Sequence, residues 1–520
     1  MKLSRRQFLK GAGGAILISA GTTERLANAR GLLTDPLLDD VIQIALATAR
    51  QAGASYADVR IVRRRAEEIS TRENHVAGVN ASESYGFGVR VVADGAWGFA
   101  ASPTVDRVEA ASTAALAVAI ANANARAIAA PVTLSPAPAV VDVWQTPLSK
   151  DPFKIPIEEK AEFLLAINRE AMKVPGVKYC TSSVEISGEW KLLATSEGSY
   201  LEQNITRLDP RYTVTAVDGG GGEFATRSHE LPPMQAGWEY LEGASLLSEA
   251  RRIGEDAVAK LKAASVTPGQ RQIILSPSNL WLTIHETVGH STELDRMLGY
   301  EANLAGTSFA TVADVGRLRY GSNLVTVYAD KTTPGGLATC AYDDDGVRTQ
   351  RWDIISNGVL TSVQTTREQA AWIGETGSRG TCYGEDYKSF PFQRMPNISL
   401  APGAKDLSTQ DLIEATDDGI YITGRGSSSI DHQRYNFQFG GQMFYEVKKG
   451  KITRPLRDVA YQANTLEFWA SCDLLGGPKS WQLHGSLHDG KGEPVQSNAV
   501  SHGCPPARFF ANVLNTRVAQ

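Results

Sequence analysis

Residues 284–290 read Ile284-His285-Glu286-Thr287-Val288-Gly289-His290, and a short strand-like segment, Gln272 to Leu275, precedes them. The residues between, Ser276-Pro277-Ser278, are typical of a helix start, because proline is favoured in the first helical turn. We therefore expect a strand, a cap and then a helix that holds His285 one to two turns from its beginning. Only 8 of the 520 residues are histidines, so chance rarely produces two of them around a glutamate in this pattern.

Histidines five residues apart do not share one face of a regular α-helix. At about 100° per residue, His285 and His290 would diverge by about 140°, whereas histidines four residues apart diverge by about 40°. A π-bulge, or a helix that ends at Gly289, would bring the two rings together. If both imidazoles bind one metal ion, the spacing therefore predicts a local irregularity in this helix.

Two imidazoles with a carboxylate beside them are suited to zinc chemistry. A catalytic zinc ion has three protein ligands and an open position for water, whose pKa it lowers to about 7. Glu286 would then act as general base on that water. Glu293, three residues after His290, is either a residue that orients the His290 ring or an ordinary surface acid. In the alternative without metal, the histidines fill polar core positions and Glu286 only forms a cap or an ion pair.

Upstream of the histidine motif, helical and strand-like patterns alternate. Apolar residues at helical spacing predict helices over 39–52, 105–129 and 240–264, and another that begins near Ile157. Period-two alternation predicts short strands at 56–62, 68–73, 86–92, 96–101, 183–186, 189–195, 199–207 and 212–217. Turns are expected at Asn80-Ala81-Ser82 and Asp94-Gly95. From Arg271 onward, strands, glycines and turns dominate.

We interpret the chain as an α+β protein, in which an N-terminal domain of mixed α/β structure precedes a β-rich C-terminal domain with the metal motif. Prolines cluster between residues 131 and 156, where we expect an extended passage between layers. The predicted units are an N-terminal α+β domain over 30–132, a central helix and antiparallel-sheet region over 133–267, and a C-terminal metal-binding catalytic domain over 268–520.

The first 29 residues have the pattern of a Tat export signal. Ser4-Arg5-Arg6-Gln7-Phe8-Leu9-Lys10 is a twin-arginine segment, and Ala27-Asn28-Ala29 is a typical cleavage site. The apolar stretch between them is about half as long as a transmembrane helix requires, and no later segment qualifies. We expect the Tat export machinery to deliver a folded protein to the periplasm, or otherwise outside the cytoplasm, with no stable membrane span after cleavage. The alternative is an uncleaved anchor.

Composition argues against several other classes of protein. Lysine and arginine total 52 against 57 for aspartate and glutamate, and this net charge of −5 offers no basic surface for nucleic acid. The 42% hydrophobic and 21% charged fractions are ordinary for a globular protein. The five cysteines contain no CxxC pair, so we expect buried free thiols for most of them.

The segment from His285 to Asp295 resembles the metal motif of the TldD/PmbA (TldD/TldE) metallopeptidase family, on the TldD-like side that keeps H-E-x-x-x-H. Further segments that carry the resemblance are Gly86-Phe87-Gly88-Val89-Arg90, Asp343-Asp344-Asp345-Gly346, Pro391 to Asn397, Gly490-Lys491-Gly492-Glu493-Pro494 and Val500-Ser501-His502-Gly503. The resemblance covers nearly the whole chain after the signal. It implies a subunit that forms a homodimer, or a heterodimer with a related family subunit, and that cleaves short or unfolded peptides with one Zn²⁺ per subunit.

The resemblance also implies a third zinc ligand, and here the chain departs from the family pattern. In the active member of the family a cysteine precedes the G-K-G-x-P segment, whereas this chain has Leu487-His488-Asp489-Gly490. Direct register places Asp489 at the ligand position, and a shift of one residue places His488 there; both side chains can bind zinc. His484 and Cys504 are further candidates nearby. Oxidation of an exposed thiolate in the periplasm offers a reason for the loss of the cysteine.

The leading hypothesis is an exported zinc-dependent peptidase in which His285 and His290 are ligands, with His488 or Asp489, and Glu286 is the general base. The alternative is a non-catalytic family partner, or a peptide-binding subunit with a degraded metal site. A metal-dependent hydrolase of other amides is a third possibility. His502 has no accompanying G-x-S-x-G elbow, so we interpret it as a turn histidine near the edge of the metal domain.

Overall fold

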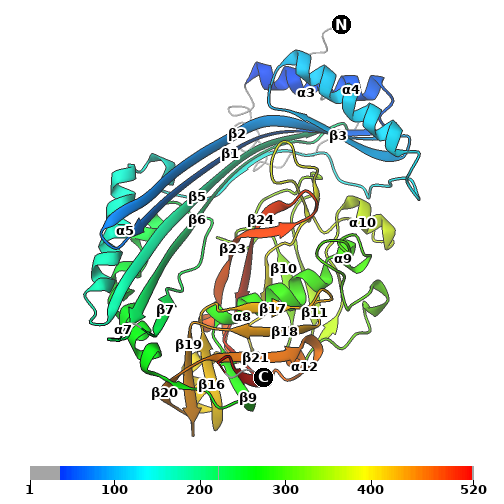
Figure 1. The fold of residues 1–520 in the computed structure, drawn as a ribbon. Coiled ribbons are helices and arrows are strands. Elements are labelled where there is room, and N and C mark those ends of the chain that lie inside the picture. Colours follow the sequence, from blue (N-terminus) through cyan, green and yellow to red (C-terminus); the bar gives the residue numbers. More distant parts are fainter. Residues whose placement is uncertain (1–34, 221, 518–520) are drawn as a thin grey trace.

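The computed structural model describes residues 35–220 and 222–517, so the predicted export signal over residues 1–29 lies outside the described residues. The fold is α+β. Figure 1 shows a long curved sheet with helices on its outer face, which arches over a β-rich second part of the chain. In the part of the chain that the structure describes, no helix combines the length and the apolar character needed to cross a bilayer.

Within these described residues, the first part is built on a seven-stranded sheet with the order β3-β2-β1-β5-β6-β4, in which β7 also pairs with β6. Its strands are β1 Tyr56–Arg72, β2 His75–Ala93, β3 Ala96–Ser102, β4 Val141–Gln145, β5 Val177–Thr195, β6 Tyr200–Val217 and β7 Phe224–Ser228. Its helices are α3 Pro36–Gln51, α4 Arg107–Asn124, α5 Ile157–Met172, α6 Glu239–Glu242 and α7 Leu246–Lys262. β1 pairs with β5 from Asp58↔Thr195 to Arg72↔Thr181, so one sheet spans the predicted boundary at residue 132.

The short strands expected in this sheet are merged into long ones. Segment 56–62 and residues 68–72 of the next predicted strand both belong to β1. The predicted turn at Asn80-Ala81-Ser82 is wrong because these residues lie inside β2, paired with β1. The chain turns after β1 at Glu73-Asn74 instead. β5 and β6 likewise each join two of the predicted strands.

The physical reason is that two separate helix layers cover the outer face of this sheet. α3 contacts β1 and α4 contacts β2 and β3, in an apolar cluster that includes Val59 and Ile61 of β1. α5 and α7 pack in a second apolar cluster with Ile69 of the same strand. Neither cluster includes Arg63 or Arg65, which lie between these positions. The apolar alternation therefore stops in the middle of β1 although the strand continues.

The predicted helices are present with modest changes. The helix expected over 240–264 is divided at Gly243 into α6 and α7, and the predicted turn at Asp94-Gly95 connects β2 to β3 with positive φ at both residues. The five cysteines are free, and four of them are buried, which confirms the expectation for most of them.

In the described residues, the second part contains a ten-stranded sheet with the order β17-β18-β21-β25-β9-β16-β19-β20-β8, in which β22 pairs with β25. The strands of this sheet are β8 Ala264–Ser265, β9 Gly269–Leu275, β16 Asp418–Thr423, β17 Ser428–Ile430, β18 Asn436–Gly440, β19 Met443–Lys448, β20 Lys451–Arg457, β21 Val459–Asn464, β22 Leu474–Leu475 and β25 Ala507–Asn515. The other strands of this part are β10 Val327–Asp330, β11 Arg351–Ser356, β12 Val359–Leu360, β13 Cys382–Tyr383, β14 Phe392–Gln393, β15 Ile398–Leu400, β23 Gln482–Lys491 and β24 Gln496–Cys504. Its helices are α8 Pro277–Ile284, α9 Leu294–Met297, α10 Arg367–Trp372, α11 Thr409–Glu414 and α12 Thr465–Ala470.

α8 is the element that positions the histidine motif. It follows β9 directly, all of its residues are buried, and it contacts β15, β16 and the β23–β24 hairpin. The hairpin lies between the curved sheet and α8 (Figure 1). The end of the chain is therefore brought to the histidine motif, from which it is about 200 residues distant in sequence.

Candidate metal centre

The helix that carries the histidine motif changes its winding at His285. α8 ends at Ile284, residues His285–Gly289 form a single π-helical turn, and His290–Thr292 continue as a 3₁₀ turn. A π-helical turn aligns residues five apart. The ring centroids of His285 and His290 accordingly lie 4.7 Å apart, which confirms the predicted irregularity.

Side chains from distant segments stabilise this irregular turn. The carbonyl of Thr287 accepts a hydrogen bond from the Tyr320 hydroxyl, and the carbonyl of Gly289 accepts one from Gln364 Nε2 at 2.6 Å. A Cβ at Gly289 would lie 2.5 Å from Sδ of Met395, so a larger residue here would displace the end of that side chain. In a regular helix, backbone N–H groups would bond these carbonyls. Here side chains from other segments supply the hydrogen bonds instead.

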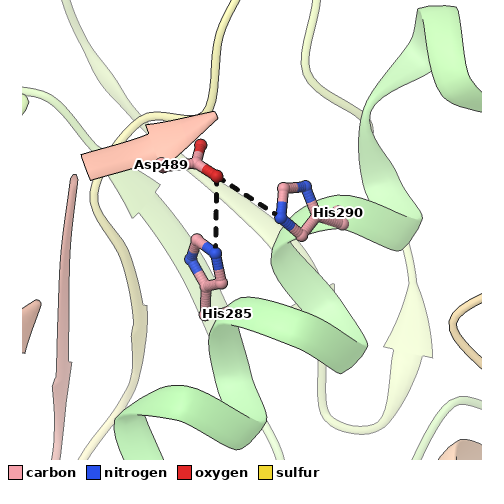
Figure 2. Close-up of side chains that lie close together, drawn as sticks. All are labelled: His285, His290 and Asp489. Atoms are coloured by element: carbon pink, nitrogen blue, oxygen red, sulfur yellow. Dashed lines mark ion pairs between the residues drawn. The ribbon is translucent and has the colours of Figure 1, made fainter. Parts of the chain in front are cut away.

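Figure 2 shows three side chains that point toward one another, namely those of His285, His290 and Asp489. Oδ1 of Asp489 lies 3.6 Å from Nε2 of His285 and 3.6 Å from Nε2 of His290. The three ligand atoms lie within 4.8 Å of one another, and all three residues are buried. A tetrahedral zinc ion with bonds of about 2.0–2.2 Å separates its ligand atoms by about 3.3–3.6 Å. The spacing and the donor types therefore fit a metal ion of this kind.

The structure separates the two sequence candidates for the third ligand. Between Ser486 and Asp489 the pairing of β23 with β24 shifts, because β23 carries an extra residue there. Asp489 is buried and faces the two histidines, whereas the side chain of His488 is 56% exposed and its Nε2 lies 3.0 Å from the carboxylate of Glu185. Contrary to the second register considered, His488 therefore lies outside the cluster.

Two other residues named as candidates also lie outside it. His484 is buried and pairs across the hairpin with His502. Cys504 is buried at the opposite end of α8, where its thiol contacts the carbonyl of Pro277. Neither side chain belongs to the group that could hold a metal among the described residues.

His502 supports the first histidine, so its interpretation as a turn residue at the domain edge is wrong. It is fully buried in β24, its Nδ1 lies 2.9 Å from the carbonyl of Ile398, and its Nε2 lies 2.8 Å from Nδ1 of His285. A carbonyl can only accept, so Nδ1–H of His502 donates to it and Nε2 of the neutral ring accepts from His285. Burial lowers the pKa of both histidines, which favours these neutral rings. The free lone pair of His285 is then on Nε2, facing Asp489.

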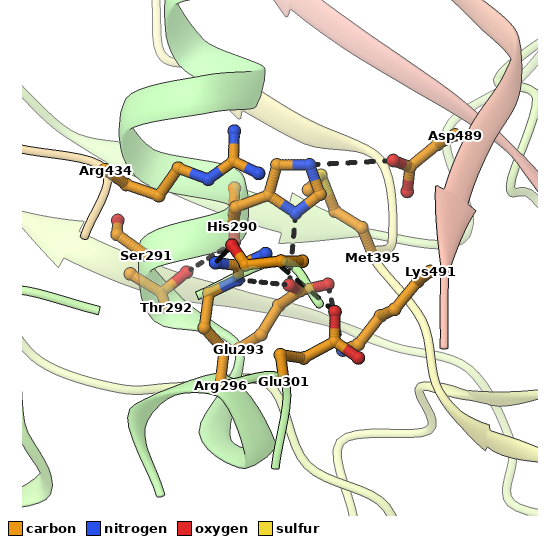
Figure 3. Close-up of polar contacts among 12 residues, drawn as sticks. His290, Ser291, Thr292, Glu293, Arg296, Glu301, Met395, Arg434, Asp489 and Lys491 are labelled. Atoms are coloured by element: carbon orange, nitrogen blue, oxygen red, sulfur yellow. Dashed lines mark hydrogen bonds and ion pairs between the residues drawn. The ribbon is translucent and has the colours of Figure 1, made fainter. Parts of the chain in front are cut away.

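Glu293 supports His290 in the way that His502 supports His285, through the ring nitrogen that faces away from Asp489 (Figure 3). Nδ1 of His290 donates to Oε2 of Glu293 at 3.1 Å, and Lys491 Nζ lies 3.3 Å from the other carboxylate oxygen. Glu293 has no exposed surface, so the orienting role is supported and the surface alternative is wrong. The third candidate ligand is supported by Arg394, which lies 3.4 Å from Oδ2 of Asp489 and also donates to its carbonyl.

Glu286 lies beside the cluster and has a partner that sequence reasoning did not find. Its half-buried carboxylate forms an ion pair with Arg434, a residue with φ of +64° between β17 and β18. Burial raises the pKa of Glu286, and the Arg434 guanidinium opposes this effect. No spacing rule connects Arg434 to the histidine motif, because the two are 148 positions apart.

Comparison with known proteins identifies metallopeptidase domains along the chain. Residues 57–126 match PmbA/TldA metallopeptidase domain 1, residues 150–264 the central domain and residues 268–511 the C-terminal domain. The chain is 30% identical over 423 residues to a metalloprotease of Methanothermobacter thermautotrophicus. The matched residues are 81% of this chain and 88% of that protein. The chain belongs to the PmbA/TldD metallopeptidase family.

Two further comparisons extend over most of the chain. A zinc metalloprotease TldD homolog of Saccharolobus solfataricus is 23% identical over 468 residues, which is 88% of this chain and 96% of that protein. The crystal structure of TldE from Thermococcus kodakarensis has the same fold, with a TM-score of 0.69 and 15% identity over 90% of this chain and 98% of that one.

Proposed function

We propose that this chain is an exported, zinc-dependent peptidase that hydrolyses short or unfolded peptides. Membership of a metallopeptidase family supports the reaction class. The observation that carries the proposal is the convergence of Nε2 of His285, Nε2 of His290 and Oδ1 of Asp489, with the Glu286 carboxylate beside them.

In this proposal each residue of the centre has a separate task. His285, His290 and Asp489 would hold one Zn²⁺ per subunit, which when bound supplies the positive charge that polarises the scissile carbonyl and acidifies water. Glu286 accepts a proton from water at its carboxylate and returns it to the leaving amine. Arg434 holds that carboxylate in place, and it favours the ionised form that can accept the proton.

The variant Glu286→Gln tests the mechanism directly, because it removes the base and keeps the ligands. We expect unchanged zinc content by elemental analysis and a fall in kcat of at least about 100-fold in a mixed-peptide digestion. His285→Ala should instead lose the metal. A Glu286→Gln enzyme with full zinc content and wild-type turnover would contradict the assignment of the base.

The second candidate is a non-catalytic family partner or peptide-binding subunit. The departure from the family pattern at the third ligand favours it, because Asp489 stands where the active member has a cysteine. Zinc content and peptide turnover of the purified chain, alone and mixed with a related family subunit, distinguish the two candidates. A chain that has no zinc and no turnover in either setting supports the non-catalytic function.

Export through the Tat pathway to the periplasm rests on residues 4–10 and 27–29. Replacing Arg5 and Arg6 by lysine should retain the protein in the cytoplasmic fraction of fractionated cells. A variant that still reaches the periplasm would contradict this route. Size measurement of the exported protein, alone and with a related subunit, would establish whether it forms a homodimer or a heterodimer.

A further inference from the structure

A small pocket, with about 20 Å³ of internal space, lies between the inner face of the curved sheet and loops of the C-terminal part. β5 and β6 of the sheet contribute Glu189, Lys191 and Arg207 to its wall. The C-terminal part contributes Lys331, directly after β10, and Asp343. The wall is therefore rich in charged side chains, and the pairing of these charges shows which ligand it can accept.

The charges contributed by the sheet are paired within the wall. Lys191 Nζ lies 2.8 Å from a carboxylate oxygen of Asp344 and 3.0 Å from one of Glu189. Arg207 lies 3.1 Å from the other oxygen of Glu189. The carboxylate of Asp343 is satisfied by backbone N–H groups, including that of Cys382 at 3.0 Å. The charged groups of the sheet and the Asp343 carboxylate therefore already have bonding partners within the protein.

Lys331 is the exception. The residue is only 5% exposed and its side chain lines the pocket. Across residues 35–220 and 222–517, no hydrogen-bond acceptor or carboxylate lies within bonding distance of its ammonium group. The other buried lysines all have carboxylate partners, namely Lys160 with Glu67, Lys191 with Asp344, and Lys491 with Asp295. The nearby Asp343 carboxylate interacts with this ammonium through charge but forms no direct ion pair with it. The ammonium therefore has free bonding positions toward the pocket, which suit an anion that enters there.

The pocket adjoins the candidate metal centre. Arg394 lines the pocket and contacts Asp489, and Asn498, another wall residue, is the cross-strand partner of Asp489. Met395 lines the pocket as well and packs against Gly289 in the π-helical turn. An anion bound at Lys331 would therefore lie beside residues that contact the candidate metal centre.

We propose that Lys331 binds a carboxylate of the peptide substrate and thereby selects peptides with a negative charge near the cleaved bond. The inference rests on the proposed peptidase function. A peptide offers this group in two ways, as its C-terminal carboxylate or as an aspartate or glutamate side chain. An amide at the same place would leave the ammonium without its charged partner.

Two pairs of fluorescently labelled peptides test the proposal on the full-length chain. The first pair is hexaalanine with a free or an amidated C-terminus, and the second is amidated hexaalanine with one central glutamate or glutamine. Binding is measured by anisotropy with a chelator present, which prevents hydrolysis. We expect the wild-type chain to bind the charged member of at least one pair about 10- to 100-fold more tightly. The pair that discriminates identifies the source of the carboxylate.

Lys331→Met should abolish this preference and leave binding of the uncharged peptides unchanged, whereas Lys331→Arg should retain most of it. Lys479→Met is the matched control, since that side chain is 90% exposed. With zinc-loaded enzyme, Lys331→Met should raise KM for the charged peptide and leave kcat unchanged. A wild-type chain without preference in either pair, or an undiminished preference in Lys331→Met, overturns the proposal. A preference in binding without any hydrolysis contradicts only the peptidase function.

Discussion

His502 and His285 are 217 positions apart in the chain, yet Nε2 of the first lies 2.8 Å from Nδ1 of the second. Because the carbonyl of Ile398 holds the other nitrogen of His502, the pair has only one arrangement of protons when both rings are neutral. A strand carbonyl thus determines, through two imidazoles, that the His285 nitrogen facing Asp489 carries the free lone pair.

Removing this support should weaken metal binding without removing a ligand. His502→Ala leaves a buried N–H of His285 without an acceptor, and we expect zinc affinity to fall about 10- to 100-fold. His502→Gln, whose side-chain oxygen can accept that hydrogen bond, should recover part of the loss. Competition with a chromogenic chelator measures the affinity. An unchanged affinity in His502→Ala would show that the second ring has no influence on the site.

The two neighbours His488 and Asp489 should respond in opposite ways. His488→Ala should keep its zinc, because that side chain bonds Glu185 outside the cluster, whereas Asp489→Ala should lose most of it. Asp489→Cys should bind zinc under reducing conditions and release it after peroxide treatment, since thiolates oxidise and carboxylates do not. Elemental analysis before and after treatment gives the result. Loss of zinc from His488→Ala would contradict the observed register of β23.

A pair of glycines in β23 tests whether the hairpin carries the site. A Cβ at Gly485 would lie 2.2 Å from the carbonyl of Val500, whereas a Cβ at Gly490 meets only Val495, at 3.4 Å. We expect Gly485→Ala to destabilise the fold by about 1–3 kcal/mol and to reduce zinc binding, because the hairpin presents both Asp489 and His502. Gly490→Ala should stay within about 0.5 kcal/mol of the wild type. Thermal unfolding of both variants, with and without zinc, provides the comparison.

His229 should make the stability depend on pH in the acidic range. Its ring stacks on Tyr212, its Nε2 lies 3.0 Å from the carbonyl of Pro210, and burial lowers its pKa to about 4. An unfolded histidine has a pKa of about 6.5, so below that pH the unfolded chain binds a proton that the folded chain does not. The contribution is complete above pH of about 6.5 and is lost as the pH falls toward about 4, by about 3 kcal/mol in total.

His229→Gln should remove this part of the pH dependence. The difference in Tm between variant and wild type is then expected to shrink as the pH is lowered through this range. A constant difference in Tm would mean that the ring is protonated equally in the folded and unfolded chains.

The irregular helix could be predicted from the spacing of two histidines, because the rotation per residue of an α-helix is a constant of the backbone. The same local reasoning applies to the helices and to the turn at Asp94-Gly95, whose residues tolerate positive φ. It failed for β1 and β2, since their middle residues are polar although they remain paired in the sheet. Backbone pairing alone does not require apolar and polar residues to alternate. Where neither helix layer covers the strand, the sequence therefore gives no sign that the strand continues.

The residue types of the candidate metal centre can be read from the amino-acid order alone, since imidazole and carboxylate chemistry does not depend on the fold. The choice between His488 and Asp489 cannot, because one extra residue in a β-bulge reverses which side chains face inward, and the bulge exists only where β23 meets β24. The roles of His502, Arg434 and Lys331 are likewise properties of the folded chain. Each depends on a contact, or on the lack of one, between segments that only long-range packing brings together.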